Sequence, residues 1–248
     1  MKNISGQDLS ITPLQLVAQR VSRVRDLLEA NSMDGLLVTS PANIRYLSGF
    51  TSEDAYVLIT QQRAVLFTDF RYITQAKIET GKTSASQETG DFSYEIRRID
   101  NNFFDIFAAL AEEDGLKSFY IEGDFITFSQ YSALTKSLPS AEFRDAGSLI
   151  RDLRAVKDHY ELSLIKQAIA IADQAFEKIL DVIRPGMTEK QICDELEYLL
   201  NKFGAYGTSF ETIAVSGPRT AMPHGKPGNR VVQNNDIITL DFGTRFCG

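Results

Sequence analysis

The sequence predicts an α/β protein, a class in which strands and helices pack in layers. Short apolar runs that are typical of buried strands alternate with helical patterns over the first ~140 residues. A long helical pattern then begins at residue 158, and a second one follows a Pro-Gly pair. Because 43% of the 248 residues are hydrophobic and 24% are charged, the chain is long and apolar enough for a substantial core.

The first part of the chain alternates between helix and strand. Thr12 and Pro13 are suited to the cap and the first position of a helix, in which apolar residues recur at three- and four-residue steps up to Leu28. Residues 1–10 are polar, and we expect a flexible N-terminus there. The later predicted elements are strands at 36–39, 55–60, 64–68, 94–99 and 118–121 and helices at 72–79 and 103–112.

The pattern changes near Gly147, which predicts a first domain at 11–147 and a second at 148–248. The second domain opens with a helix at 158–183 that Pro185-Gly186 ends. Thr188 and Gln191 then fit a capping box, in which each side chain bonds the other residue's backbone N–H at the start of a helix. Strands at 210–215 and 231–242 enclose a loop rich in Gly and Pro.

Charge and composition exclude several classes of protein. The net charge of −7 argues against nucleic-acid binding, which needs a basic face. No apolar run approaches the roughly 18 residues of a membrane span, and the N-terminus lacks the apolar segment of a secretory signal. Cys193 and Cys247 lie too far apart for a Cys-rich zinc site, so we expect two reduced thiols in a cytoplasmic protein.

Two residues at the end of the chain have the chemistry of a hydrolase site. Asp241 ends an apolar strand, and its carboxylate oxygens suit a divalent metal ion. Burial of such a group is costly unless it is paired or metal-bound. His224 lies between Pro223 and Gly225, where its imidazole could donate to a substrate carbonyl or carry a proton. Taken singly, each has a simpler interpretation: a solvated strand end for Asp241 and an exposed loop for His224.

The other candidate groups are weaker. Arg230 and Lys226 flank the histidine and could hold a substrate carboxylate, although most surface charges have no specific role. His159 begins the long helix without a second ligand at helical spacing, which indicates a solvated surface residue. The sequence contains no Gly-x-Ser-x-Gly elbow, so a serine hydrolase is not supported.

Several segments together resemble the pita-bread metallopeptidases, the family of methionine aminopeptidase, creatinase, prolidase and Xaa-Pro aminopeptidase. The resemblance implies an N-terminal creatinase-type α/β domain followed by the first part of an α+β pita-bread domain. It extends from about residue 15 to the end of the sequence. In chain order, the segments that carry it are 34–50, 68–76, 153–157, 185–189, 209–217 and 223–225.

The resemblance also implies an activity. Because simple methionine aminopeptidases lack the first domain, its presence implies an Xaa-Pro aminopeptidase, which hydrolyses the peptide bond before proline in a proline-containing peptide. Three alternatives stay open: an Xaa-Pro dipeptidase, a creatinase-like amidinohydrolase that works without metal, and a non-catalytic peptidase-like binding module. The family further implies a homodimer formed through the N-terminal domain.

For the site, the resemblance implies two divalent metal ions, with Mn²⁺ or Co²⁺ preferred and Zn²⁺ as the alternative. Asp241 matches the first metal ligand. His224 matches a histidine that lies beside the substrate, stabilises the tetrahedral intermediate and is not a ligand. Phe210 and Arg230 are further candidates for substrate binding.

The sequence departs from the family pattern after Gly243. The family's second Asp ligand and its His and two Glu ligands come later in the chain and are not among these 248 residues. One carboxylate cannot hold two metal ions about 3.5–4 Å apart. We therefore expect the 248-residue chain to be an N-terminal fragment that binds no metal tightly and has no peptidase activity.

Overall fold

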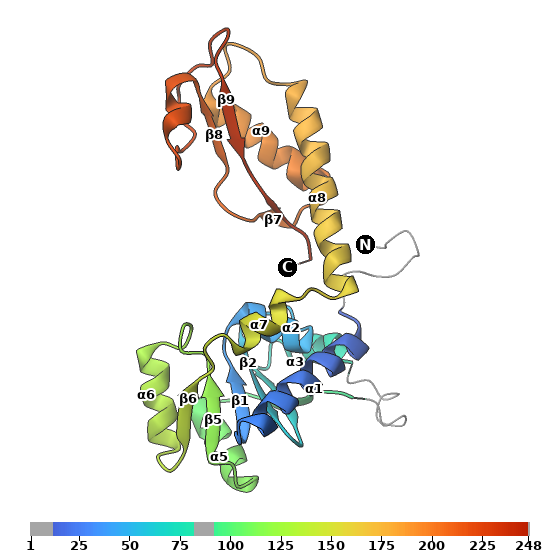
Figure 1. Ribbon diagram of the computed structural model, residues 1–248, viewed down its shortest axis with the longest axis vertical. Helices are drawn as coiled ribbons and strands as arrows, with labels where there is room; N and C mark the ends of the chain where they lie inside the picture. Colours follow the sequence, from blue (N-terminus) through green and yellow to red (C-terminus); the bar gives the residue numbers. More distant parts are fainter. Residues whose placement is uncertain (1–11, 82–91, 248) are drawn as a thin grey trace. The chain divides into compact units, whose positions relative to one another are not determined.

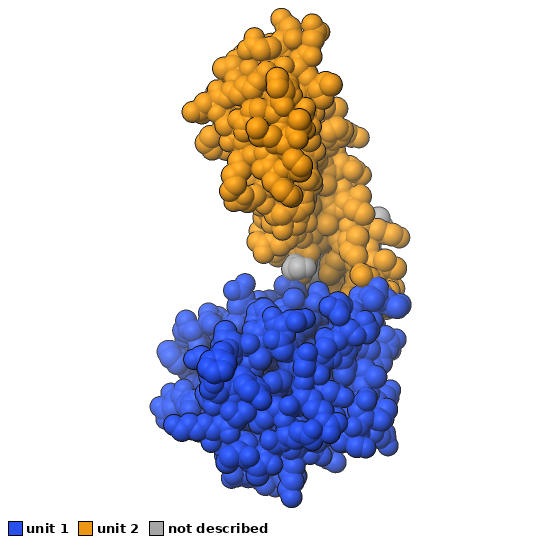
Figure 2. Space-filling model, turned by 60° about the vertical axis from the view of Figure 1, so that its left-hand side comes forward, with its two compact units in different colours: residues 1–156 blue, residues 157–248 orange. Residues whose placement is uncertain are grey.

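The structure is a computed structural model that describes residues 12–81 and 92–247, so the predicted flexible segment at 1–10 lies outside the described residues. The chain divides into two compact units, Met1–Val156 and Lys157–Gly248, drawn in blue and orange in Figure 2. Each unit has hydrophobic core residues of its own.

The first unit is built around a six-stranded sheet in the order β4-β3-β2-β1-β5-β6 (Figure 1). β2 runs antiparallel to its neighbours β1 and β3, and the other neighbouring strands are parallel. The carboxyl ends of β1, β5 and β6 therefore lie along one edge of the sheet. The strands are β1 (Gly35–Val38), β2 (Ala55–Thr60), β3 (Ala64–Thr68), β4 (Glu95–Arg98), β5 (Ser118–Ile121) and β6 (Glu142–Asp145).

Helices cover both faces of this sheet, which explains the continuous apolar runs in its strands. Leu36 and Val38 pack into one core with residues of α1, α2, α3 and α7. Leu37, which points the other way along β1, packs into a second core with residues of α5 and α6. The helices are α1 (Leu14–Ala30), α2 (Pro41–Ser48), α3 (Ile73–Glu79), α5 (Phe103–Glu113), α6 (Phe128–Ser137) and α7 (Leu149–Ala155).

The predicted strands and helices of the first part are confirmed, with ends that shift by a residue or two. The cap of α1 was predicted wrongly. Pro13 is the cap residue, with an extended ψ of 127°, and among the described residues the helix has no side-chain cap hydrogen bond. The helix therefore begins one residue later than Thr12 and Pro13 predict.

Helices α2, α6 and α7 and strand β6 were not predicted. α2 is short, and Gly49 closes it in the left-handed conformation at φ 76°. α7 lies in the stretch that the prediction assigned to the second domain, whose boundary was placed at 147/148. Ile150 of α7 is buried in a core of the first unit, so the structure divides after Val156.

The second unit begins with two helices, α8 (His159–Leu180) and α9 (Glu189–Lys202). Both start with a capping box: Asp158 with Glu161, and Thr188 with Gln191 as predicted. The Gln191 backbone N donates to Thr188 Oγ1 at 3.1 Å, and the Thr188 N donates to Gln191 Oε1 at 2.9 Å.

Two short antiparallel pairs accompany these helices. β8 (Ile213–Ser216) pairs with β9 (Ile238–Asp241), and β7 (Gly207–Thr208) pairs with β10 (Thr244–Arg245). The predicted strand at 231–242 is too long. Val231 makes only an isolated bridge to Thr188, and Asn235 has a positive φ of 68°, which breaks the extended conformation before β9.

Within residues 12–81 and 92–247, none of the helices combines the length and the apolar character that a membrane span requires.

Candidate active site

The candidate site is a hollow of about 860 Å³ in the second unit. Of the residues that the resemblance implies for the site, Phe210, His224 and Asp241 line it, and the sequence candidate Lys226 lines it as well. They come from the segment before β8, the loop after η1 (Gly217–Ala221) and the end of β9. The fold thus brings to one surface three side chains that are up to 31 positions apart in the sequence.

Asp241 reaches the hollow because β9 alternates its faces. Ile238 and Leu240 pack against the core residues Ile192, Ala214 and Val232, whereas Thr239 and Asp241 are exposed. The Asp241 carboxylate has no hydrogen bond or ion pair with another described residue. Because the Asp241 carboxylate is exposed, it carries no cost of burial and is open to a ligand.

His224 lies on the long connection between β8 and β9. Its side chain is exposed, and within the described part of the chain it has no hydrogen-bond partner. Gly225 brings the backbone close to the sheet, since a Cβ atom added there would lie 2.9 Å from Val215 Cγ1. The histidine is thus held next to β8 while its imidazole stays available.

Phe210 and Arg230 differ in their placement. Phe210 is 46% exposed and offers an apolar wall to the hollow. Arg230 does not line it: its guanidinium donates to Ser216 Oγ and to both carboxylate oxygens of Asp236, at 2.7 and 3.1 Å. The bond from Arg230 lowers the pKa of Asp236 below its usual value. Arg230 therefore connects the side chain of Ser216, at the end of β8, to that of Asp236, before β9.

The rest of the wall is polar and partly acidic. Asp194, Glu197 and Glu211 line it, together with Lys226, which pairs with Glu211 at 2.9 Å. Burial, followed by the neighbouring carboxylates, raises the pKa of the Cys193 thiol to about 11. The Cys193 thiol is therefore mostly protonated at physiological pH. His159 is exposed at the start of α8, as predicted.

The carboxylates of this site do not form a complete metal centre. Among the described residues, no three side chains of His, Cys, Asp or Glu are placed to hold one ion. Asp241 fits the role of a single carboxylate ligand, because it is exposed in the hollow and has no partner within residues 12–81 and 92–247. The residues present do not fit a two-metal site by themselves.

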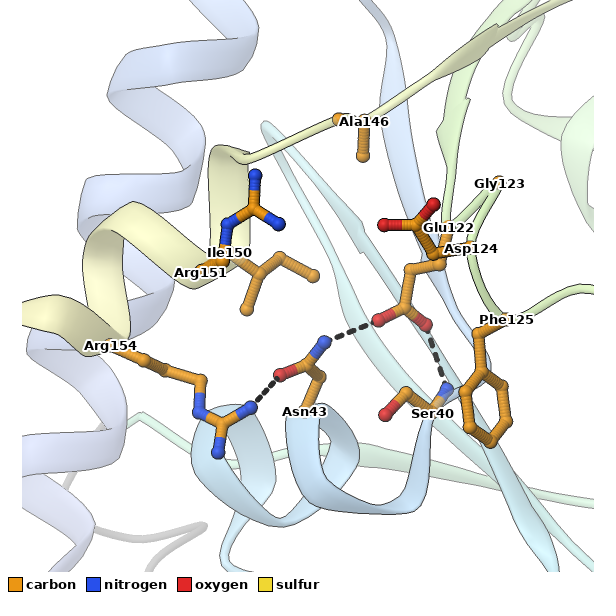
Figure 3. A pocket seen from close by; sticks show the side chains of 11 residues that line it. Ser40, Asn43, Glu122, Gly123, Asp124, Phe125, Ala146, Ile150, Arg151 and Arg154 are labelled. Atoms are coloured by element: carbon orange, nitrogen blue, oxygen red, sulfur yellow. Dashed lines mark hydrogen bonds between the residues drawn. The ribbon is translucent and has the colours of Figure 1, made fainter.

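A second hollow, of about 240 Å³, lies in the first unit at the carboxyl ends of β1 and β5 (Figure 3). Its buried carboxylate, Glu122, accepts hydrogen bonds from the backbone N–H of Ser40 at 2.7 Å and from Asn43 Nδ2 at 2.5 Å. Arg154 in turn donates to Asn43 Oδ1 at 2.7 Å. The Glu122 carboxylate thus already occupies the anion position at the N-terminus of α2.

Comparison with known proteins identifies the family. Residues 20–156 match the creatinase/prolidase N-terminal domain, and residues 163–248 match metallopeptidase family M24. The chain therefore belongs to the M24 metallopeptidases that carry a creatinase/prolidase N-terminal domain, and its fold is that of the pita-bread peptidases. An uncharacterized peptidase of Bacillus subtilis is 31% identical over 229 residues, which are 92% of this chain and 62% of that protein.

Solved structures give the same result. The Xaa-Pro dipeptidase of Bacillus anthracis is 35% identical with a TM-score of 0.84, over 93% of this chain and 62% of that one. The X-Pro aminopeptidase of Thermotoga maritima is 32% identical with a TM-score of 0.81, over 92% of this chain and 61% of that one. The chain thus spans about 62% of the length of the relatives that it matches.

Proposed function

We propose that this chain supplies part of the active site of a proline-specific metallo-exopeptidase, an enzyme that hydrolyses the peptide bond before proline. The observation that carries the proposal is that His224, Asp241 and Phe210 line one hollow and that both polar groups are without partners among the described residues. Free polar groups that converge on a hollow are what a substrate site needs. Membership of a metallopeptidase family supports metal-assisted hydrolysis.

We assign a role to each of the three side chains. Asp241 is a ligand of a divalent metal ion, Mn²⁺ or Co²⁺ in preference to Zn²⁺, whose chemistry when bound is to activate water and polarise the carbonyl. His224 donates a hydrogen bond to the carbonyl oxygen as negative charge develops on it. Phe210 contacts the apolar part of the substrate. Arg230 is not assigned to the substrate, because it is already engaged by Asp236.

Aminopeptidase activity on Xaa-Pro peptides is our first choice, and dipeptidase activity on Xaa-Pro is the second. The similarity to the Xaa-Pro dipeptidase of Bacillus anthracis favours the second. The presence of both His224 and Asp241 supports a peptidase over a metal-free amidinohydrolase or a non-catalytic binding module. A homodimer through the first unit and a cytoplasmic location stay predictions.

A chimera tests the proposed function. Residues 1–248 would be joined to the remaining C-terminal part of the Bacillus anthracis dipeptidase and assayed with Mn²⁺ on Ala-Pro and on Xaa-Pro-Xaa tripeptides. We expect cleavage before proline, and for His224→Ala a loss of roughly 10²–10³ in kcat, the usual effect of removing one donor to the oxyanion. His159→Ala, the only other histidine, should leave the rate unchanged.

Two results would sink the proposal: no cleavage of either peptide by a folded chimera, or equal effects of the two histidine variants. Preference for the tripeptide supports an aminopeptidase, and preference for Ala-Pro supports a dipeptidase. A polypeptide of residues 1–248 alone should show no turnover, because it contains one of the implied metal ligands; measurable turnover would contradict that expectation.

A further inference from the structure

Both ends of the loop that carries His224 are bonded to one buried side chain, that of Glu189. This loop, residues 217–228, leaves the sheet directly after Ser216 at the end of β8. It returns to the start of α9, where the Lys190 backbone N donates to the Gly228 carbonyl at 3.0 Å. Glu189, the first residue of α9, lies between these two ends and is only 1% exposed.

Each carboxylate oxygen of Glu189 holds one end of the loop. Oε1 accepts from the Ser216 backbone N at 2.8 Å and from Ser216 Oγ at 3.0 Å. Oε2 accepts from the Gly228 backbone N at 3.2 Å. His224 lies between these two attachment points in the chain, so one side chain is bonded to the backbone on both sides of it.

Arg219 extends this attachment to the residues next to the histidine. Its Nη1 pairs with Glu189 Oε2 at 3.1 Å, and its Nη2 donates to the Lys226 carbonyl at 2.6 Å. Gly228 leaves room for the pair, since a Cβ atom there would lie 2.8 Å from Arg219 Nη1. Glu189 is thus connected to the loop both before His224 and two residues after it.

The energetics favour the closed loop. A carboxylate that leaves water is costly unless hydrogen bonds and a counter-charge replace its hydration. For Glu189 Oε2 those partners are Gly228 and Arg219, so this oxygen is satisfied only when the loop is closed, whereas Oε1 is bonded to Ser216 of β8. The N-terminus of α9 also favours negative charge at this position.

We propose that Glu189 is a positioning residue for His224: its buried carboxylate holds both ends of the 217–228 loop and thereby fixes the imidazole at the hollow. Glu189 itself touches no substrate. The proposal rests on the proposed function only for the use made of the imidazole, because the order of the loop can be measured without any activity.

The test compares Glu189→Gln with Glu177→Gln in the 248-residue chain. Gln keeps the size of the side chain and removes its charge, and Glu177 is an exposed residue of α8 in the same unit. Hydrogen–deuterium exchange followed by mass spectrometry would report each segment. We expect the 217–228 amides to exchange at least tenfold faster in Glu189→Gln, with α8 and β8 within threefold of the parent. Glu177→Gln should match the parent throughout.

The imidazole provides a second readout. The chain has two histidines, and His159 on α8 serves as an internal reference in the proton NMR spectrum. In Glu189→Gln the His224 ring resonances should broaden or double while those of His159 stay unchanged. A role of Glu189 in general stability alone would leave the His224 resonances sharp in the folded molecule.

Arg219→Gln covers the case in which Glu189→Gln does not fold, because the Arg219 side chain is 31% exposed. It should raise exchange of the loop about threefold without a change in α8. Unchanged loop exchange in either folded variant, or a uniform rise through residues 157–247, would overturn the proposal. If the loop responds as expected but the chimera cleaves no Xaa-Pro peptide, the proposed function fails and the positioning of His224 stands.

Discussion

The charged side chains of the second unit fall into two groups according to their partners. Glu189 and Asp236 are fully engaged, the first by two loop ends and Arg219, the second by Arg230 and the backbone of Gln233. Asp241 has no such partner among the described residues, and the same holds for His224. The engaged groups build the site, and the free ones are available for chemistry.

Cys193 provides a pH-dependent prediction. With a pKa of about 11, its thiolate fraction at pH 8.5 is roughly a hundredfold below that of a free thiol. A more basic thiolate is a stronger nucleophile, and this raises the rate of each thiolate about tenfold. The two effects together predict that alkylation of Cys193 by iodoacetamide is roughly tenfold slower than alkylation of glutathione. The rate should keep rising with pH between 8 and 10.

Cys193→Ser supplies the background rate, since Cys247 is buried. A plateau in the rate near pH 8.5–9 would show an ordinary thiol pKa and would contradict the assigned environment.

At the residue scale, the sequence predicts the free groups better than the engaged ones. His224 and Asp241 have residue types and neighbours that indicate chemistry, and both line the hollow. Glu189 lies in segment 185–189, one of the segments that resemble the family, but its sequence neighbours do not indicate a role. Its partners lie 27 and 39 positions away, and only the folded loop brings them to it. Arg230 shows the opposite case: the sequence made it a candidate for substrate binding, but its side chain pairs with Asp236.

At the scale of elements, the loop between β8 and β9 depends on a backbone conformation that glycine permits. Gly217 has a φ of 53°, in the left-handed region. A Cβ atom there would lie 2.5 Å from Arg230 Nη2 and 2.6 Å from Asp236 Oδ1. The same ion pair that closes the loop thus leaves no room for a side chain at its first residue.

Gly217→Ala should therefore cost more than the backbone strain alone. Gly147→Ala is the matched control, with the same φ of 53° and nothing within 4 Å of its added Cβ atom. We expect a loss of free energy of unfolding of about 1 kcal/mol for the control and about 2–4 kcal/mol for Gly217→Ala. Amide exchange in β8 measures the loss for Gly217→Ala, and exchange in β1 measures the loss for Gly147→Ala, because the two glycines lie in different units. Equal losses would show that the ion pair yields to the new methyl group.

The elements that the sequence failed to predict are short or depend on tertiary contacts. α2 has only eight residues, and α7 has a charged sequence whose burial comes from Ile150 and its neighbours against the first core. The strand predicted at 231–242 was too long because apolar residues continue upstream of the turn at Asn235. Long, strongly periodic helices such as α8 were predicted well, because their pattern alone specifies them.

The two units of the whole molecule differ in what they contribute to the candidate site. The first unit has two cores around one sheet. In its hollow at the carboxyl ends of β1 and β5, the Glu122 carboxylate accepts hydrogen bonds from the backbone N–H groups of Thr39 and Ser40. The second carries the candidate site, in which we propose the exposed Asp241 carboxylate as a metal ligand. This chain spans about 62% of its relatives, and the described residues do not complete a two-metal centre.

The metal content of the chimera tests whether Asp241 is a metal ligand. Asp241→Asn would be compared with Asp194→Asn, the same change at another exposed carboxylate of the same hollow. After dialysis against Mn²⁺, mass spectrometry of the metals should find about two ions per chain in the parent and in Asp194→Asn. Asp241→Asn should lose at least one ion and its cleavage of Xaa-Pro peptides. Full metal content and activity in Asp241→Asn would contradict the account.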